Sequence, residues 1–528
     1  MVVLQLLYST ICIVGTVILA TVIYGYFWYI KRNDWYWKKI GIKHVPFSEG
    51  MLMLNPFRKQ RIHELISKYY KKYGKISGAV AFGNPTLLVG DPDLLKDVLI
   101  KDFHNFHYRR DMKLGDDLFD NIVMSMKGDD WKRVRTIITP VFTTKRLKMM
   151  TNVMNECAQT VMNEFEKKLA DDGIIDAKTS FGAFTLDVIA RAAFATRINS
   201  INEPGNEFVQ HAKKIFGDFS MISFILMLFL PSWISRRIPM GGRSSWEFFR
   251  DVTLNVIKER KQKGKKYNDV LQLFMDTLEE DIEKNAKHET PKIEIIEDEE
   301  DQYGSIFNKE LSHALRYKTL SQDEVIAQCV LFFSVGYETT AATLTFVAYS
   351  LALNPECQEK LIQEVDSAFR NHKEMSYDVI RDMKYLDCVV SETLRMYPAL
   401  IMSERTASED YELKDTGLTI EKGNAISFPI YAMHHDPEYF PEPEKFKPER
   451  FIEPSHHPLA YLPFGAGPRN CLGMRFALME IKMCMSNILR HYRFKRAKNT
   501  KVPLEFKNGM GFLTVDDLPL KIEKRTDV

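Results

Sequence analysis

The chain has 528 residues, of which 45% are hydrophobic and 27% are charged, and its formal net charge is +2. This composition predicts a globular protein with a large apolar core, and the nearly balanced charge argues against a nucleic-acid partner. The seven cysteines are scattered, odd in number and never spaced C-x-x-C, which suggests neither a disulfide framework nor a zinc site and favours a reducing compartment.

Residues 1–30 form an apolar run that is interrupted only by Gln5, tyrosine, glycine and small hydroxyl residues. The run exceeds the ~20 residues that a helix needs to cross a bilayer, and it lacks the basic start of a cleaved signal peptide. By the positive-inside rule, the basic residues after it leave the rest of the chain in the cytosol. They are Lys31, Arg32, Lys38, Lys39 and Lys43. We expect a single N-terminal transmembrane helix at 1–30, a basic linker at 31–50 and one large domain at 51–528.

Short apolar and β-branched runs alternate with turn residues near the start of this domain. Residues 79–82 and 86–89 flank a Gly-Asn-Pro turn, which predicts a hairpin, and the Gly-Asp-Pro that follows predicts the start of a helix. From about residue 130 to about 400 the apolar period is mostly helical, and short strands and prolines return only after that. The sequence therefore predicts a mainly α fold with a small β region.

The segment from Phe216 to Trp233 is strongly apolar, but Asp218, Ser223 and its shortness argue against a second membrane span. It is interpreted either as a segment that dips into the membrane interface or as a plain core helix. The acidic stretch from Glu294 to Asp301 has no apolar periodicity and is interpreted as a solvated loop.

The stretch from Val325 to Ala352 is apolar nearly all round, which predicts a long buried helix. A polar interruption within it contains Gly336, Glu338 and Thr339. A threonine hydroxyl bonds to the carbonyl one turn back and, beside a glycine, loosens the helix, which would leave room for water and dioxygen. A kinked helix with a satisfied glutamate is the alternative interpretation.

Glu392 and Arg395 are three residues apart, which places them on one helix face as an ion pair that can be buried. Such pairs are abundant on protein surfaces, so this one is weak evidence for a function when taken alone. A Lys-Pro-Glu-Arg-Phe segment that contains Arg450 lies downstream.

Residues 464–473 read Phe-Gly-Ala-Gly-Pro-Arg-Asn-Cys-Leu-Gly and fit the pattern F-x-x-G-x-R-x-C-x-G. The glycines let the backbone approach a flat ligand, and Arg469 can pair with an anionic group on it. A buried helix begins at or just beyond Cys471, and a helix N-terminus favours a thiolate that can ligate a metal. With motifs in the matching order along nearly the whole chain, the sequence resembles a cytochrome P-450, a haem-thiolate monooxygenase. It is most similar to the drug- and steroid-oxidising branch that includes thromboxane synthase.

The resemblance implies the cytochrome P-450 fold and a haem b cofactor whose iron is ligated by Cys471. It also implies a set of cofactor-binding residues, namely Arg109, Trp131, Arg135, Arg405, Phe464, Gly467, Arg469 and Gly473. The arginines would pair with the haem propionates, and Trp131 could donate its indole N–H to one of them. Arg109 and Arg110 could equally be a solvated pair.

Glu338 and Thr339 match the acid and threonine that, in this family, pass protons to bound dioxygen as general acids. Glu392, Arg395 and Arg450 match an E-R-R network that holds the cysteine loop. Family members commonly have Ala or Gly where this chain has Val335, whose extra methyls narrow the space above the haem. The segment from residue 216 to 233 matches the lid over the substrate pocket.

The implied reaction inserts one oxygen atom of O2 into a lipophilic xenobiotic, steroid or fatty acid at the endoplasmic reticulum membrane. The chain has no G-x-G-x-x-G and no ferredoxin-type cysteine cluster, so electrons from NADPH would arrive through a separate flavoprotein reductase, with cytochrome b5 as a possible second partner. Candidate docking residues for the reductase are Lys132, Arg133, Lys145, Arg146 and Lys482, with scattered solvated charge as the alternative. Two other functions stay open: a lipid-peroxide isomerase and a non-catalytic haem carrier or sensor.

Overall fold

A computed structural model describes residues 34–50, 60–81, 84–110, 117–217, 243–267, 269–278, 319–507 and 511–527, with isolated positions between 13 and 28. The predicted transmembrane helix lies largely outside these residues, as do most of the apolar segment 216–233 and all of the acidic stretch 294–301. In the part that is described, helices dominate and the strands are short, which confirms a mainly α fold with a small β region.

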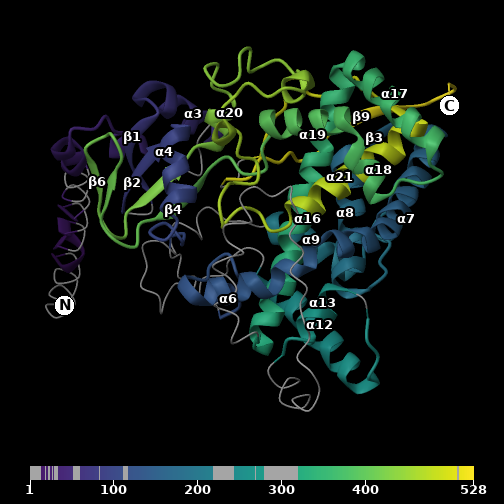
Figure 1. Cartoon of the computed structure of the whole chain (residues 1–528), viewed down its shortest axis with the longest axis horizontal. Coiled ribbons are helices and arrows are strands. Elements are labelled where there is room, and N and C mark those ends of the chain that lie inside the picture. The colour runs from purple at the N-terminus through teal and green to yellow at the C-terminus, as the bar shows by residue number, and fades with distance from the viewer. Residues whose placement is uncertain are drawn as a thin grey trace, which may run out of the picture.

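The helices form the larger part of the molecule, on the side away from the N-terminus (Figure 1). The longer ones are α3 (Ile62–Tyr73), α6 (Gly128–Ile138), α7 (Thr144–Leu169), α8 (Ala177–Phe194), α9 (Glu207–Gly217), α12 (Arg243–Lys263), α16 (Gln322–Leu353), α17 (Pro355–Asn371), α19 (Lys384–Met396) and α21 (Met474–His491). The shorter helices are α2 (Phe47–Gly50), α4 (Pro92–Lys96), α5 (Asp117–Asp120), α13 (Val270–Met275), α18 (Tyr377–Asp382) and α20 (Ile430–His434). A π-helical turn, η2, spans Asp97–Lys101, and 3-10 turns η3, η4 and η5 span Thr139–Phe142, Pro448–Phe451 and Pro458–Ala460.

The largest sheet has the strand order β1-β2-β7-β4 and lies near the N-terminus (Figure 1). Its strands are β1 (Ile76–Ala81), β2 (Asn84–Val89), β7 (Ala425–Phe428) and β4 (Ser403–Thr406). Strands β1 and β2 form the predicted antiparallel hairpin, and β2 runs parallel to β7. A second sheet, of order β3-β9-β8, joins β3 (Ile174–Asp176), β9 (Pro519–Lys524) and β8 (Tyr492–Arg496), while β5 (Tyr411–Leu413) pairs with β6 (Leu418–Ile420).

Helix α16 runs through the centre of the helical part. Ser321 begins it with a capping box, in which the Ser321 side chain accepts from the Glu324 N–H and the Glu324 carboxylate accepts from the Ser321 N–H. Among the described helices it is the one that is long and apolar enough to cross a membrane, but most of it is buried inside the protein. This burial identifies α16 as a core helix, as its all-round apolar sequence predicts.

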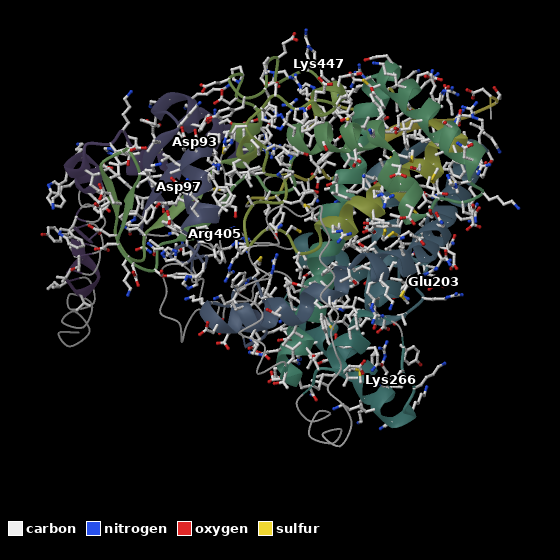
Figure 2. The ribbon with its side chains drawn as sticks, viewed as in Figure 1. Asp93, Asp97, Glu203, Lys266, Arg405 and Lys447 are labelled. Carbon is white, nitrogen blue, oxygen red and sulfur yellow. The ribbon has the colours of Figure 1, made fainter. Side chains whose placement is uncertain are left out.

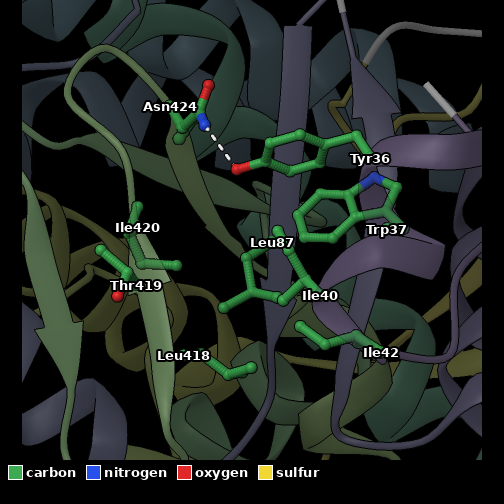
Figure 3. A pocket seen from close by; sticks show the side chains of 10 residues that line it. Tyr36, Trp37, Ile40, Ile42, Leu87, Leu418, Thr419, Ile420 and Asn424 are labelled. Carbon is green, nitrogen blue, oxygen red and sulfur yellow. Dashed lines mark hydrogen bonds between the residues drawn. The ribbon is translucent and has the colours of Figure 1, made fainter. Parts of the chain in front are cut away.

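Residues 34–42, which belong to the predicted basic linker, are packed against the largest sheet and β6. The Trp37 side chain is 3% exposed and its indole N–H donates to the Ala79 carbonyl over 3.0 Å. Tyr36 lies beside it and accepts a hydrogen bond from the Asn424 amide over 3.1 Å (Figure 3). Apolar side chains, among them Leu87 and Leu418, line a small pocket between residues 36–42 and strands β2 and β6 (Figure 3). This stretch is therefore a folded part of the domain.

Candidate active site

The loop that carries Cys471 is closed by its own backbone hydrogen bonds. The Cys471 N–H donates to the Phe464 carbonyl over 2.8 Å, and the Gly465 N–H donates to the Leu462 carbonyl over 3.1 Å. Helix α21 begins at Met474, three residues after the cysteine, as the apolar pattern predicts. The loop thus presents the cysteine just before a helix N-terminus, where backbone N–H groups favour a negative charge.

The structure requires glycine at position 467 for a reason that the motif alone does not reveal. Its φ is +70°, and a Cβ on it would lie 1.9 Å from the Leu99 carbonyl oxygen. Any larger residue would push the loop away from η2, so the glycine lets the two backbones touch. Gly473, in contrast, has an ordinary φ, and a Cβ there would only reach van der Waals contact with Phe142.

Cys471 is deep in the protein but retains accessible surface. Its residue surface is exposed, whereas burial among protein atoms is the largest cause of the raised pKa of its thiol. The two observations agree if the thiol faces an interior space. The Gly473 N–H and the charges of Arg135 and Arg109 lower the pKa of the thiol without outweighing burial. Coordination to a metal ion would deprotonate such a thiol outright.

The arginines that the resemblance assigns to the cofactor are gathered near Cys471. Arg405 is 1% exposed, and its pKa falls well below the usual value because of burial and then because of its neighbours Arg109, Arg469 and Arg135. Burial and the same neighbours lower the pKa of Arg469 to about 9. Figure 2 shows Arg405 between the sheet and the helical part. The structure thus brings together a cluster of like charges, and Arg109 belongs to it.

Part of this cluster is fixed by the chain itself. Arg135 donates to the backbone and side-chain oxygens of Asn470 over 2.9 and 2.8 Å. Arg469 donates to the Met124 and Met126 carbonyls, and its guanidinium lies 4.5 Å from the centre of the Trp131 ring. Buried Trp131 therefore stacks on an arginine of the site.

Two guanidinium groups of the cluster keep an unused donor. The Nε atoms of Arg405 and Arg469 are buried and have no hydrogen-bond partner in the described part of the chain. Buried donors and clustered positive charges are costly unless an anion satisfies them. A thiol beside cations with orphaned N–H groups fits an iron porphyrin, which carries a metal and two carboxylates.

One stripe of α16 is more accessible than the rest of the helix. Between residues 324 and 352 every side chain is buried except Phe332, Val335, Gly336 and Thr339, whose spacing places them on one helix face. Phe142 links this stripe to the cysteine loop, because its ring lies 5.5 Å from that of Phe332 and also borders Gly473.

Helix α16 is continuous from Gln322 to Leu353, so the predicted loosening does not interrupt it. The Thr339 hydroxyl does bond to the Val335 carbonyl one turn back, over 2.7 Å, as predicted. Gly336 instead serves packing, since a Cβ on it would come within 2.4 Å of the Ile189 side chain on α8. The glycine therefore allows α8 and α16 to approach closely.

Glu338 points away from this stripe and has partners that the sequence analysis missed. It forms an ion pair with Lys178 of α8 and accepts a hydrogen bond from the Thr514 hydroxyl over 2.9 Å. Lys178 and Thr514 are 160 and 176 residues away, so no local pattern could have found them. Glu338 and Thr339 are adjacent in sequence but engage different partners.

Glu392, Arg395 and Arg450 meet as the resemblance implies. Glu392 and Arg395 are both 0% exposed and form two hydrogen bonds of 2.7 and 2.9 Å. Arg450 donates to the same carboxylate over 3.2 Å, and the Lys447 N–H adds a contact of 2.9 Å. Further donors of Arg395 bond to the His434 and Pro443 carbonyls over 2.9 and 2.8 Å.

The predicted basic docking patch needs correction. Lys482 is 7% exposed and paired with Asp387, because α21 is a core helix. Arg133 is bonded to Glu324 and to the Thr319 carbonyl. Lys482 is therefore buried away from any partner protein, and Arg133, although partly exposed, is already paired within the chain. The other predicted docking residues, Lys132, Lys145 and Arg146, are exposed or partly exposed.

A family model described as Cytochrome P450 matches residues 43–521. The chain belongs to the cytochrome P450 family. Cytochrome P450 3A28 of Bos taurus is 35% identical over 503 residues, which cover 93% of this chain and 92% of the relative. Cytochrome P450 3A40 of Oryzias latipes is 36% identical over 490 residues, which cover 90% of each protein. Cytochrome P450 3A11 of Mus musculus is 35% identical over 513 residues, which cover 94% of each.

Membership confirms the family that the sequence motifs indicate. A cytochrome P450 is an oxidoreductase of the monooxygenase type, and family membership implies haem as its cofactor. The match runs from residue 43 to residue 521 and covers the sheet, the helical core and the cysteine loop, so this part of the chain has the P450 fold.

Proposed function

We propose that this chain is a haem-thiolate monooxygenase of the endoplasmic reticulum membrane with Cys471 as the axial ligand of the iron. It inserts one oxygen atom of O2 into a lipophilic xenobiotic, steroid or fatty acid, as expected of the drug- and steroid-oxidising branch. The supporting observation is an accessible cysteine in a hydrogen-bonded loop beside buried arginines with orphaned N–H groups.

The chain's own residues hold the cofactor in this proposal. Cys471 supplies the thiolate, while Arg405 and Arg469 use their orphaned Nε donors for the propionates. Arg109 and Arg135 add positive charge, and Trp131 keeps the Arg469 guanidinium in place by stacking. When bound, the haem supplies the activation of dioxygen, which a thiolate ligand favours.

Glu338 and Thr339 supply the protons. Lys178 and Glu338 are both slightly exposed, with side-chain exposures of 14% and 12%, so the pair can take up protons from solvent. Thr339 lies on the accessible stripe with its hydroxyl donating to Val335, which leaves its oxygen able to accept a hydrogen bond, so that it can pass its own proton on as it takes one from a protonated Glu338. Delivery then requires the Glu338 carboxylate to leave Lys178 and turn toward Thr339.

The substrate lies against the apolar members of the stripe, Phe332 and Val335. Both side chains are partly exposed on an otherwise buried helix, so they bind apolar groups and exclude water. The methyls of Val335 narrow the space beside Thr339 compared with Ala or Gly. A Val335→Ala variant should therefore accept bulkier substrates.

Electrons come from NADPH through a separate flavoprotein reductase, with cytochrome b5 as an optional second donor. The docking surface for an acidic partner is formed by Lys132, Lys145 and Arg146. Lys145 is exposed and the other two are partly exposed. This surface lies near the cysteine loop, because Thr144 bonds to Arg475 at the start of α21. An N-terminal helix at residues 1–30 holds the catalytic domain on the cytosolic side of the membrane.

The first experiment compares the ferrous carbon-monoxide spectra of the wild type and of Cys471→Ser in membranes. We expect a strongly red-shifted Soret band in the wild type and its loss in the variant. Cys157→Ser is the matched control, because Cys157 is buried in the core and its substitution should leave the band in place. A histidine-like band in intact wild-type protein would overturn the assignment.

Substrate turnover separates the open alternatives. A monooxygenase consumes NADPH in a substrate-dependent manner only when purified reductase is present. An isomerase converts a lipid peroxide without reductase, and a carrier or sensor does neither. The Glu338–Lys178 pair beside Thr339 supports the monooxygenase, because peroxide isomerisation requires no proton supply.

The proton supply is tested by Glu338→Gln, for which we expect hydroxylated product per NADPH to fall by on the order of 10²-fold. Glu324→Gln is the matched control, because Glu324 is a buried carboxylate on the same helix that is also paired with an arginine. Equal losses in the two variants would exclude a specific role for Glu338.

A further inference from the structure

His434 lies between the E-R-R network and the segment that leads into the cysteine loop. It is the last residue of α20 and is 0% exposed. Its ring stacks on Tyr461 with centroids 5.3 Å apart, and the Tyr461 hydroxyl donates to the Ser391 carbonyl next to Glu392. No sequence motif in the chain singled this histidine out.

Both ring nitrogens of His434 have a backbone partner. Nε2 lies 2.8 Å from the Leu462 nitrogen, which can only donate. Nε2 must therefore be the unprotonated acceptor, and Nδ1 carries the hydrogen and donates to the Arg395 carbonyl over 3.2 Å. The backbone amide of Leu462 thus selects one neutral tautomer.

The contacts of His434 form a continuous chain of bonds. Arg395 donates to the His434 carbonyl over 2.9 Å, while the His434 ring donates back to the Arg395 carbonyl. On the other side, the Leu462 carbonyl accepts from Gly465, and the next bond of the loop joins Phe464 to Cys471. Desolvation by burial, with the nearby charges of His435 and Arg395, lowers the pKa of His434 well below its usual value and keeps the ring neutral.

From this geometry we infer that His434, as its Nδ1–H tautomer, is a positioning residue that ties the Glu392–Arg395 pair to the Cys471 loop. Without its acceptor, the Leu462 amide would be buried and unpaired, and the start of the loop would be free to shift. The inference rests on the proposed ligation by Cys471. It assigns to His434 the retention of the thiolate geometry rather than any contact with substrate.

The test uses two substitutions, of which one keeps a hydrogen-bond acceptor at the place of Nε2 and the other does not. In His434→Gln the side-chain amide oxygen reaches the place of Nε2 and can still accept from Leu462, whereas Asn is one carbon shorter and cannot. We measure, in the haem-loaded protein, the rate at which the red-shifted carbon-monoxide band converts to the form without thiolate. Because His434→Asn leaves the buried Leu462 amide without an acceptor, we expect its conversion rate to rise by roughly 5- to 100-fold. The rate for His434→Gln should stay close to that of the wild type.

His435→Asn is the matched control, since His435 is the adjacent buried histidine and its ring bonds to the Tyr431 carbonyl, one turn back in the same segment, over 2.8 Å. It should lower the thermal midpoint without a faster conversion at a temperature where every variant is folded. Equal conversion rates for H434N and H435N would overturn the inference, as would equal rates for H434N and H434Q. A wild type without the red-shifted band would overturn the ligation by Cys471 instead.

A second measurement applies if H434N does not accumulate as folded holoprotein. Hydrogen–deuterium exchange at single-amide resolution should find the Leu462 amide strongly protected in the wild type and in H434Q. Exchange at Leu462 as fast as at exposed loop amides of the wild type would overturn the inference without any further variant.

Discussion

Arg395 and Arg405 are both large, fully buried cationic side chains, yet they are bonded in opposite ways. Arg395 has a carboxylate on one side and backbone carbonyls on the other, and each of its nitrogens has a partner. Arg405 bonds to the Glu404 carbonyl, its Nε has no partner in the described part of the chain, and its closest charged neighbours include three other arginines.

This difference distinguishes a buried arginine that stabilises the fold from one that is available to bind an anionic ligand. A buried charge whose partners all come from the same chain contributes to the fold, and removing one member leaves the rest uncompensated. A cluster of like charges with unused donors destabilises the folded chain by itself and recovers that free energy when an anion binds. The two regions should therefore respond in opposite ways to the same substitution.

The largest effect is expected for Arg395→Met, which leaves the Glu392 carboxylate buried without its main partner. The free energy of unfolding should fall by about 3–5 kcal/mol in both the haem-free and the haem-bound protein. Chemical denaturation of both forms measures it. Arg250→Met provides the reference, because Arg250 belongs to an exposed ion pair whose loss should cost less than about 1 kcal/mol.

Arg405→Met should reverse this pattern. Removal of one cation relieves repulsion from Arg109, Arg469 and Arg135, so the haem-free protein should be at least as stable as the wild type. Haem affinity should fall by roughly 10- to 100-fold, as expected for the loss of one charge-assisted hydrogen bond. Haem transfer to an acceptor protein measures the affinity, and a destabilised haem-free variant would contradict the binding role.

A smaller effect on stability is expected from substitution of Glu480, whose carboxyl is buried without the partners that Glu392 has. Glu480 on α21 is 1% exposed, neither of its oxygens has a partner among the described residues, and burial raises its pKa well above the usual value. Below the usual pKa, both the folded and the unfolded chain hold the proton. As pH rises above it, only the unfolded chain ionises, so the folded state loses stability.

Glu480→Leu should therefore stabilise the protein by about 1–2 kcal/mol at pH 8 and by less at pH 5. Denaturant titrations at the two pH values test this dependence. Glu203→Leu, which changes an exposed carboxyl, should leave the pH dependence unaltered. A pH-independent gain at Glu480 would mean that packing, rather than ionisation, causes it.

The parts of the molecule that local patterns define were predictable. The apolar run at 325–352 gave the central helix, and the turn residues gave the hairpin of β1 and β2. Candidate residues for the site, such as Cys471 and Arg469, could be named because their motif is contiguous. The structure then brings Cys471 close to Arg109 and Arg135.

The rest depends on contacts between distant segments, which no local pattern encodes. Lys178 reaches Glu338 only because α8 packs on α16, and Gly336 permits that packing. The motif predicts that Gly467 lets the loop approach a flat ligand, but it does not disclose that a side chain at this position would also clash with the Leu99 carbonyl. The sequence predicts a buried helix after Cys471, but no local pattern discloses that Lys482 on this helix is paired with Asp387.

The docking of Tyr36 and Trp37 on the sheet limits the distance between the domain and a membrane. If residues 1–30 cross a bilayer, only residues 31–36 separate the end of that span from Trp37, whose ring is buried against β1. Even when fully extended, a stretch of this length reaches at most about 22 Å. The edge of the sheet at β1 is then held within that distance of the lipid headgroups, so the docking of Trp37 limits how far the domain can move from the membrane.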